Sequence, residues 1–492
     1  MIHLNLWHMS CLLLFSSMFY VWQPDFDTQK HCRKKRESLK CVEYVLRVFK
    51  FERNLLLESG GATDLSNNDI IVSLDIGTSK IRAIIGEMNN GTFNIIGVGS
   101  ADSEGIRKGV IVDIDQTVQS IRNAVDHAER MVGIQISEVY VGISGNHIGL
   151  MSSHGVVAVS NEDREIGEED MERVLKAAEV IAVPPEREII DVVAKQYVVD
   201  GLEGIQDPRG MIGVRLEVEA TIITGAKTAI HNLLRCVEKA GLKVSDLVLM
   251  SLGAGQLALS KDEKTMGSVL VDIGAGATTI AIFEEDSLVA TSTLPIGGEF
   301  VTNDIAYGLR TLTDQAEKVK LKYGCAWLDD AAADVMFKVT RIGSNVDKEF
   351  SQEDLAAIIE PRVQEIFQMI SQEVKRLGYN ELPGGYILTG GTVSMPGVLQ
   401  VAQHELAASV RVAVPDYIGV RDPGFTSGVG ILHSVIRSLR IRPSINNGGG
   451  NNNNNNNNNK KPTNRPKPNS AQESEQKPGL FERLKNMFSE FI

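Results

Sequence analysis

Apolar runs with a strand-like pattern begin abruptly at residue 69. The segment DIIVSLDIGTSKIRAIIGE (69–87) has β-branched residues on both sides of a Gly-Thr-Ser turn. An Asn-Gly pair then turns the chain into TFNIIGVGS (92–100). Short runs of this composition, separated by turn residues, are typical of β-strands joined by hairpins. The pattern therefore predicts a meander of three strands.

A helical pattern follows this meander. Asp115 is a candidate N-cap for a helix that runs to about Val132, because its carboxylate can accept hydrogen bonds from free backbone N–H groups. One face of this helix is apolar at the spacing of a 3.6-residue period. The residues on that face are Val118, Ile121, Val125 and Ala128. The next segment, SEVYVGISG (137–145), predicts a buried strand.

The strand–turn–strand pattern occurs twice in the chain. IVSLDIGTSKIRAIIGE (71–87) is matched in form by SVLVDIGAGATTIAIFEE (268–285), with Asp75 and Asp272 at the same place in the two copies. One Asp-Ile-Gly turn alone is equally compatible with a plain hairpin. Two copies at half-protein spacing indicate a duplicated domain with a cleft between the halves.

Two further blocks separate and follow the copies. Strand-like runs and one acidic helical stretch indicate a small α+β insertion within 151–227. The stretch 303–377 has a largely helical pattern. The segment YILTGGTVSMPGVLQVAQHEL (386–406) predicts a strand, a Gly-Gly turn and a helix with Pro396 near its start.

The two turns have the composition that phosphate binding requires. Small residues in tight turns can direct backbone N–H groups toward a phosphate, and a nearby carboxylate can hold Mg²⁺, normally through its water shell. Asp75 and Asp272 are the two carboxylates, and Lys80 can add a positive charge. The small residues are Gly77, Thr78 and Ser79 in the first turn, and Gly274, Ala275 and Gly276 in the second.

Three of these motifs, taken in order, resemble those of a known superfamily. DIGTSK (75–80), VDIGAGATT (271–279) and LTGGTVSMPG (388–397) are similar to the phosphate-1, phosphate-2 and adenosine motifs of the ATPases that include actin, heat-shock chaperones and sugar kinases. Further segments resemble the FtsA family of bacterial cell-division proteins. These are GIRKGVIVDID (105–115), VGISGNHI (141–148), IGGEFVTNDIAYGL (296–309) and the last fourteen residues. The resemblance covers about residues 70–440 and this C-terminal end.

The resemblance implies an α/β actin-like ATPase fold. Two duplicated α/β domains would surround a nucleotide cleft, with an inserted small α+β subdomain and a C-terminal amphipathic helix on a disordered linker. The implied subdomains are 1A (70–150 and 228–265), 1C (151–227), 2A (266–301 and 379–440) and 2B (302–378), and the linker is 441–479.

The resemblance also implies that the cleft holds ATP and Mg²⁺. Asp75 and Asp272 would lie near the metal ion, separated from it by water. Glu317 and Lys320 would reach the ribose and adenine; the alternative is a solvated pattern of helical charges. The phosphates would contact Gly77, Thr78, Ser79, Lys80, Gly274, Gly276 and Thr278, while Gly390 and Gly391 would admit the adenosine and Gly298 would flank the nucleotide.

Hydrolysis needs a carboxylate or a glutamine that orients the attacking water. In the matching segment LMSLGAGQLAL (249–259), Gln256 is the one residue that could serve. We therefore expect slow turnover at most, with ATP acting mainly as a ligand that closes the cleft.

The C-terminal segment LFERLKNMFSEFI (480–492) forms an amphipathic pattern at helical spacing. Such a helix is about 20 Å long, which is short of the roughly 30 Å hydrocarbon core, so it predicts a helix lying in the membrane interface. Basic residues in the Asn-rich linker favour anionic lipid. The alternative is a helix that docks on its own body or in a partner's groove. The apolar face consists of Leu480, Phe481, Leu484, Met487, Phe488, Phe491 and Ile492.

Residues 1–69 do not share the pattern of the body. The apolar run MSCLLLFSSMFYVW (9–22) is followed by the basic cluster HCRKKR (31–36). This order allows either an additional membrane anchor or the product of a mis-assigned upstream start codon.

Composition narrows the function further. The net charge of −13 argues against nucleic-acid binding by the body. The chain has five cysteines without CxxC or zinc-ligand spacing, which argues against disulfides and zinc and favours a reducing, cytoplasmic compartment.

Three functions fit these observations. The resemblance implies an ATP-binding protein that polymerises with itself and tethers FtsZ, the tubulin-like division protein, at the cytoplasmic face of the cell membrane at the septum. Other division proteins and anionic lipid would be further partners. A sugar or acetate-type kinase of the same fold is one alternative, although no clear catalytic Asp for a substrate hydroxyl is present. A pilus-assembly scaffold is the other.

Overall fold

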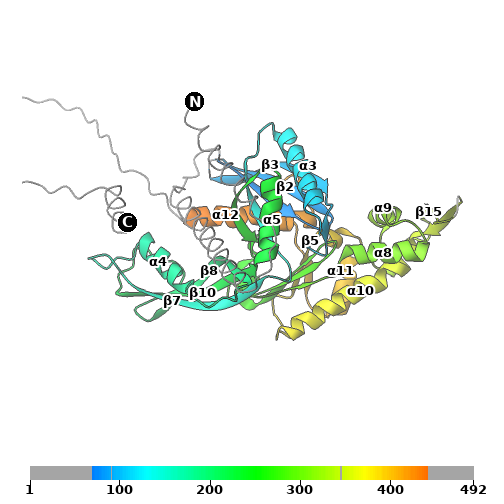
Figure 1. Ribbon diagram of the computed structural model, residues 1–492. Coiled ribbons are helices and arrows are strands. Elements are labelled where there is room, and N and C mark those ends of the chain that lie inside the picture. The colour runs from blue at the N-terminus through cyan, green and yellow to red at the C-terminus, as the bar shows by residue number, and fades with distance from the viewer. Residues whose placement is uncertain (1–68, 90, 344–345, 442–492) are drawn as a thin grey trace, which may run out of the picture. The chain divides into compact units, whose positions relative to one another are not determined.

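Two five-stranded mixed sheets with the same internal order form the centre of the computed structural model, which describes residues 69–89, 91–343 and 346–441 (Figure 1). The predictions for the N-terminal extension, the linker and the C-terminal helix fall outside this range, apart from boundary residues 69 and 441. No helix among the described residues is long and apolar enough to cross a membrane.

The first sheet has the order β11-β6-β1-β2-β3, in which β1, β2 and β3 form the predicted antiparallel meander. β6 and β11 then extend the sheet in parallel with β1. The strands are β1 (Asp69–Ile76), β2 (Lys80–Asn89), β3 (Thr92–Asp102), β6 (Glu138–Ile143) and β11 (Lys243–Leu249).

The second sheet repeats this arrangement as β14-β13-β12-β17-β18. Its three antiparallel strands are again followed by two parallel ones. The strands are β12 (Ser268–Ile273), β13 (Thr278–Glu284), β14 (Ser287–Leu294), β17 (Tyr386–Thr389) and β18 (Val410–Val412). The predicted duplication is confirmed.

Both faces of each sheet are covered, which explains the continuous apolar runs in β1 and β12. In the first sheet, Leu74 packs toward α3 (Ile114–Val132) and α5 (Lys227–Lys239), while Ile71 packs toward α12 (Thr426–Ile441). In the second sheet, one face packs against α8 (Gly298–Leu309), α10 (Gln352–Arg376) and α11 (Val398–Leu406), and the other against α6 (Met250–Ala258). The short helix α7 (Lys261–Met266) leads into β12.

Helix α3 confirms the predicted apolar face, because Val118, Ile121, Val125 and Ala128 are all buried. The predicted N-cap is wrong by two residues. Asp113 is the cap and accepts a hydrogen bond from the N–H of Gln116, whereas Asp115 lies in the first turn. Two aspartates two positions apart offer the same capping chemistry, so the pattern could not separate them.

The first insertion is the predicted α+β unit. Its antiparallel sheet has the order β7-β10-β8-β9, and α4 (Glu168–Ala178) packs on one face, with Val174 among the side chains of their shared core (Figure 1). The strands are β7 (Gly149–Ala158), β8 (Arg187–Val199), β9 (Leu202–Ile205) and β10 (Arg215–Ala226).

The second insertion lies between β14 and β17. Helices α8 and α10 run side by side at its centre, and α9 (Thr313–Tyr323) packs beside α8 (Figure 1). The largely helical pattern missed a hairpin of β15 (Met336–Thr340) and β16 (Asp347–Ser351), which packs Phe337 and Phe350 into the core. Short 3-10 turns occupy Leu328–Asp330, Gly391–Ser394 and Pro423–Phe425.

Candidate functional site

A cavity of about 600 Å³ lies between the two sheets and is lined from both halves. The Gly77–Lys80 turn and the Gly274–Ala277 turn both contribute to it, as do the first turn of α8 and the Gly390-Gly391 pair after β17. The sequence repeat therefore places its two copies on opposite walls of one cleft.

The two turns have the same backbone geometry. The N–H of Gly77 donates to the carbonyl of Lys80 at 3.1 Å, and the N–H of Gly274 donates to the carbonyl of Ala277 at 3.0 Å. They also approach each other closely, because a Cβ on Gly276 would lie 2.7 Å from Cγ2 of Thr78. A side chain at position 276 would therefore collide with Thr78.

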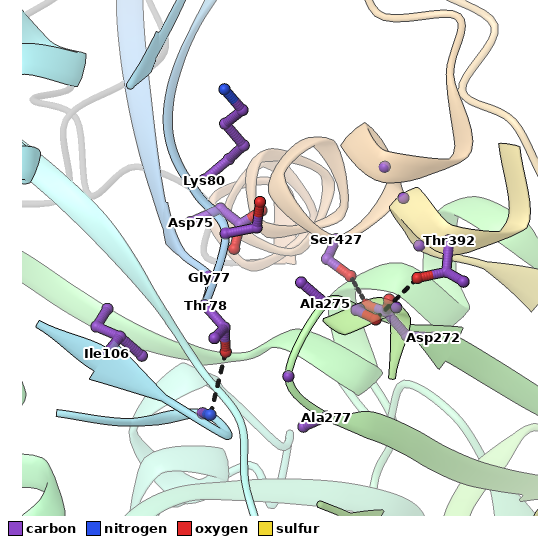
Figure 2. A pocket seen from close by; sticks show the side chains of 18 of the residues that line it. Asp75, Gly77, Thr78, Lys80, Ile106, Asp272, Ala275, Ala277, Thr392 and Ser427 are labelled. Atoms are coloured by element: carbon purple, nitrogen blue, oxygen red, sulfur yellow. Dashed lines mark hydrogen bonds between the residues drawn. The ribbon is translucent and has the colours of Figure 1, made fainter. Parts of the chain in front are cut away.

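The two aspartates of the repeat are both within this cleft but have different partners. Asp75 lies 3.6 Å from Arg82 Nη1, and Asp272 accepts a hydrogen bond from the Ser427 hydroxyl at 2.5 Å (Figure 2). Burial raises the pKa of Asp75 to about 6, with Arg82 opposing the rise and the charge of Asp272 adding to it. Burial also raises the pKa of Asp272. The cleft thus concentrates negative charge that is only partly compensated.

The opposite end of the cleft is built around α8 and α9. Lys320 Nζ donates to the Gly298 carbonyl at 3.0 Å and pairs with Glu317 at 2.7 Å. The Lys320 side chain is only 12% exposed, so it is not a solvated surface charge.

Gly390 has a φ of +94°, and a Cβ there would lie 2.4 Å from an Asp272 oxygen, so only glycine fits.

Most of the predicted site residues line this one cleft. They are Asp75, Gly77, Thr78, Ser79, Lys80, Asp272, Gly274, Gly276, Gly298, Glu317, Lys320, Gly390 and Gly391. Lys80 is directed away from Thr78 in Figure 2 and forms an ion pair with Asp102 at 2.5 Å.

Two predicted residues do not line the cleft. Thr278 is fully buried, and its hydroxyl donates to the carbonyl of Ile296 at 2.8 Å, so it supports the fold around the turn. Gln256 lies in α6, and its buried Oε1 has no hydrogen-bond partner among the described residues. Gln256 therefore does not line the cleft beside the two turns.

Sequence reasoning missed several polar residues of the cleft, of which Arg82, Ser427 and Thr392 contact the predicted motifs. Arg82 follows Lys80 by two positions in β2, and its guanidinium stacks over Phe425 at 4.9 Å. The Ser427 hydroxyl donates a hydrogen bond to Asp272, and the Thr392 hydroxyl donates one to the carbonyl of Gly274. An arginine inside the apolar strand IRAIIGE was a usable signal for Arg82. The other two contacts join residues more than 100 positions apart, which no local pattern reveals.

Comparison with known proteins identifies the family. A family model described as cell division protein FtsA matches residues 269–430, and one described as the SHS2 domain inserted in FtsA matches 145–224. Cell division protein FtsA of Bacillus subtilis is 53% identical over 378 residues, covering 77% of this chain and 86% of the relative. The chain belongs to the FtsA family. FtsA of Pseudomonas aeruginosa is 43% identical, with 75% and 89% covered.

Membership of the FtsA family confirms the resemblance inferred from the motifs and makes this a cell-division protein. Among solved structures, a type IV pilus biogenesis complex of PilM and PilN matches with a TM-score of 0.52 and 16% identity, covering 76% of this chain and 99% of that one. At this identity the match supports the actin-like fold alone. The SHS2 match falls on the first insertion, from β7 to β10.

Proposed function

We propose that this FtsA-family chain binds ATP with Mg²⁺ in its central cleft, with slow turnover at most, and that ATP acts mainly by closing the two halves on each other. The observation that carries the proposal is the pair of matched turns facing each other beside Asp75, which is buried, and Asp272, which is half-buried. Backbone N–H groups in such turns are suited to phosphate oxygens.

The residues fit a metal ion that is held largely by phosphate and water. Among the described residues, no group of three or more His, Cys, Asp or Glu side chains could hold a metal ion by itself. Mg²⁺ commonly keeps several waters and binds through one or two carboxylates plus substrate phosphates. Asp75 and Asp272 supply the carboxylates, and Mg²⁺ would neutralise phosphate charge beside them.

Nucleotide binding is testable by titration calorimetry of the full chain with ATP, with and without Mg²⁺. Asp272→Ala should weaken Mg-dependent affinity by about 10- to 100-fold, the range seen when groups that orient a metal are lost. Asp416→Ala is the matched control, because Asp416 pairs with Arg421 at the surface and does not line the cleft. Unchanged affinity in Asp272→Ala contradicts the assignment.

We further propose that the chain polymerises at the cytoplasmic face of the cell membrane at the septum and tethers FtsZ there. Family membership and the amphipathic pattern of 480–492 support this function. Large exposed apolar side chains in the second insertion also support a protein contact there. They are Tyr307 on α8, Leu312 before α9, and Ile342.

Membrane attachment is testable by co-sedimentation with vesicles that contain anionic lipid, in the presence and absence of FtsZ. The full chain should carry FtsZ into the pellet, whereas a chain ending at Gly479 should leave both in solution. Phe488→Glu on the apolar face should release the protein, and Asn486→Glu on the polar face should not. Equal sedimentation of the two glutamate variants contradicts an interfacial helix.

The kinase and pilus-scaffold alternatives are not favoured. Membership of the FtsA family argues against both, and the likeness to the PilM–PilN complex concerns the fold alone.

A further inference from the structure

A short hairpin from the first half lines the cleft. β4 (Ile106–Arg107) and β5 (Val110–Ile111) pair around Lys108 and Gly109. The N–H groups of Val112 and Asp113 both donate to the carbonyl of Gly105, which closes the loop. Lys108 has a φ of +50°, an uncommon conformation for a residue with a side chain. The loop therefore fixes the backbone direction from which the Lys108 side chain leaves.

That direction leads to the second half. The Nζ of Lys108 lies 5.5 Å from the centroid of the Phe300 ring, which belongs to α8. The same ring also lies 5.9 Å from Arg362 Cζ, and Arg362 is anchored to Asp304 at 2.5 Å. The Cα of Lys108 would be 3.1 Å from a Cβ on Gly276, so the backbones of the two halves meet here.

Charge complements this contact. Glu299 precedes Phe300 and is half-buried. Burial raises the pKa of Glu299, and the positive charges of Arg107 and Lys108 are among those that oppose the rise. The hairpin thus presents two cations to a carboxylate and an aromatic ring on the facing helix.

The hairpin is also tied to the first phosphate turn. The N–H of Gly109 donates to Thr78 Oγ1 at 3.1 Å, the contact drawn as a dashed line in Figure 2. This bond uses the hydroxyl oxygen as acceptor, so the hydroxyl proton stays available as a donor to a phosphate oxygen. A bound phosphate and the hairpin can therefore share Thr78.

We propose that the hairpin of residues 105–112 is a strap across the phosphate end of the cleft, and that the contact of Lys108 with Phe300 is its clasp. The halves cannot separate at this end without breaking that contact. The clasp therefore slows the release of a nucleotide from the closed cleft. This inference rests on the proposed ATP binding, and it makes Lys108 and Phe300 positioning residues.

Dissociation of a fluorescent ATP analogue from the full chain, chased with excess ATP in Mg²⁺, tests the clasp. Lys108→Met removes the cation but keeps the side-chain stem, and Phe300→Leu removes the ring but keeps an apolar residue. Each should raise the dissociation rate about two- to fivefold, the size of one cation–π contact. The double variant should be no faster than the faster single variant, because both remove the same contact.

Two further variants separate the clasp from general structural effects. Lys108→Arg should keep the wild-type rate, since a guanidinium also binds a ring face. Lys348→Met is the matched control, because Lys348 lies 4.7 Å over Phe350 within the second insertion and spans no cleft. A wild-type rate in Lys108→Met, or single-variant effects that multiply in the double variant, overturns the proposal.

Failure of ATP binding is distinguishable from failure of the strap. If the wild-type chain does not bind the analogue, the proposed function fails. The strap is then tested without nucleotide by hydrogen exchange of the Gly109 N–H, which Lys108→Met should accelerate and Lys348→Met should not. Equal exchange in the two variants overturns the strap.

Discussion

The two halves of the molecule share one frame, which consists of the five-stranded sheet and its strand–turn–strand unit, and they differ in the side chains and insertions around it. Each has the same strand order and the same turn, closed by hydrogen bonds of 3.1 Å and 3.0 Å. The aspartate of the first half is paired with an arginine, whereas that of the second half accepts a bond from a serine hydroxyl. Duplication explains the frame, and local differences determine what each wall can bind.

The insertions differ even more than the aspartates. The first half carries a four-stranded antiparallel sheet with one helix, and the second carries three helices and a hairpin. Neither insertion alters the strand–turn–strand unit at the cleft. A duplicated strand–turn–strand unit can therefore keep its geometry while the insertions around it diverge.

The largest expected effect concerns two adjacent glycines of the second half. Gly390→Ala should lower the free energy of unfolding by about 2–4 kcal/mol, because its φ is +94° and the new Cβ would meet Asp272. Gly391→Ala is the control, since no atom lies within 4 Å of a Cβ there. Urea unfolding measures both. Equal losses contradict the close approach.

The second prediction compares the aspartates through pH. Because burial raises the pKa of Asp75 from 3.8 to about 6, the folded state binds more protons than the unfolded state between these values. The stability contributed by Asp75 is therefore present below pH 4 and lost as pH rises to 6.

Asp75→Asn should remove this dependence. Without nucleotide or metal, the variant should gain up to about 3 kcal/mol relative to the wild type between pH 4 and pH 7. Urea unfolding at each pH gives the difference. A constant difference across that range contradicts a raised pKa.

The third prediction concerns the junction of the two turns. Gly276→Ala places a methyl group against Thr78 and should hold the walls apart, which weakens ATP affinity by about tenfold, or 1.4 kcal/mol. Thr78→Ser removes the methyl of Thr78 and should restore part of the affinity in Gly276→Ala. Calorimetry gives both values. The absence of rescue contradicts direct contact between the turns.

The smallest effect is expected at Lys80. Its pair with Asp102 is exposed, so Lys80→Met should change the free energy of unfolding by less than about 1 kcal/mol. Lys80→Met should also weaken ATP binding less than Arg82→Met, because Arg82 lies against Asp75. A larger loss of ATP affinity in Lys80→Met than in Arg82→Met contradicts this prediction.

The sequence predicted the frame because its signals are local. Alternating and continuous apolar runs end at Asn-Gly or Asp-Ile-Gly turns, and the repeat places Asp75 and Asp272 alike. The hairpin of β15 and β16 escaped prediction because its strands are only five residues long and bury few side chains, namely Phe337, Val339 and Phe350. Short strands gain their stability from packing, which a local pattern does not contain.

Within the site, the glycine turns and both aspartates were predictable because their motifs need those residue types. Ser427 and Thr392 were not, because they reach Asp272 and Gly274 across 155 and 118 residues. Gln256 was chosen for its chemistry, yet α6 does not direct it to the cleft. Residue type alone predicts which chemistry a side chain can perform, whereas tertiary packing decides where that side chain lies.

Hydrogen exchange of the wild-type chain with and without Mg-ATP tests the central claim most directly. If the two turns form one phosphate site, amides of 77–80 and of 274–277 should both gain protection when ATP binds. Protection of one turn alone, or of neither while ATP is bound, contradicts the account.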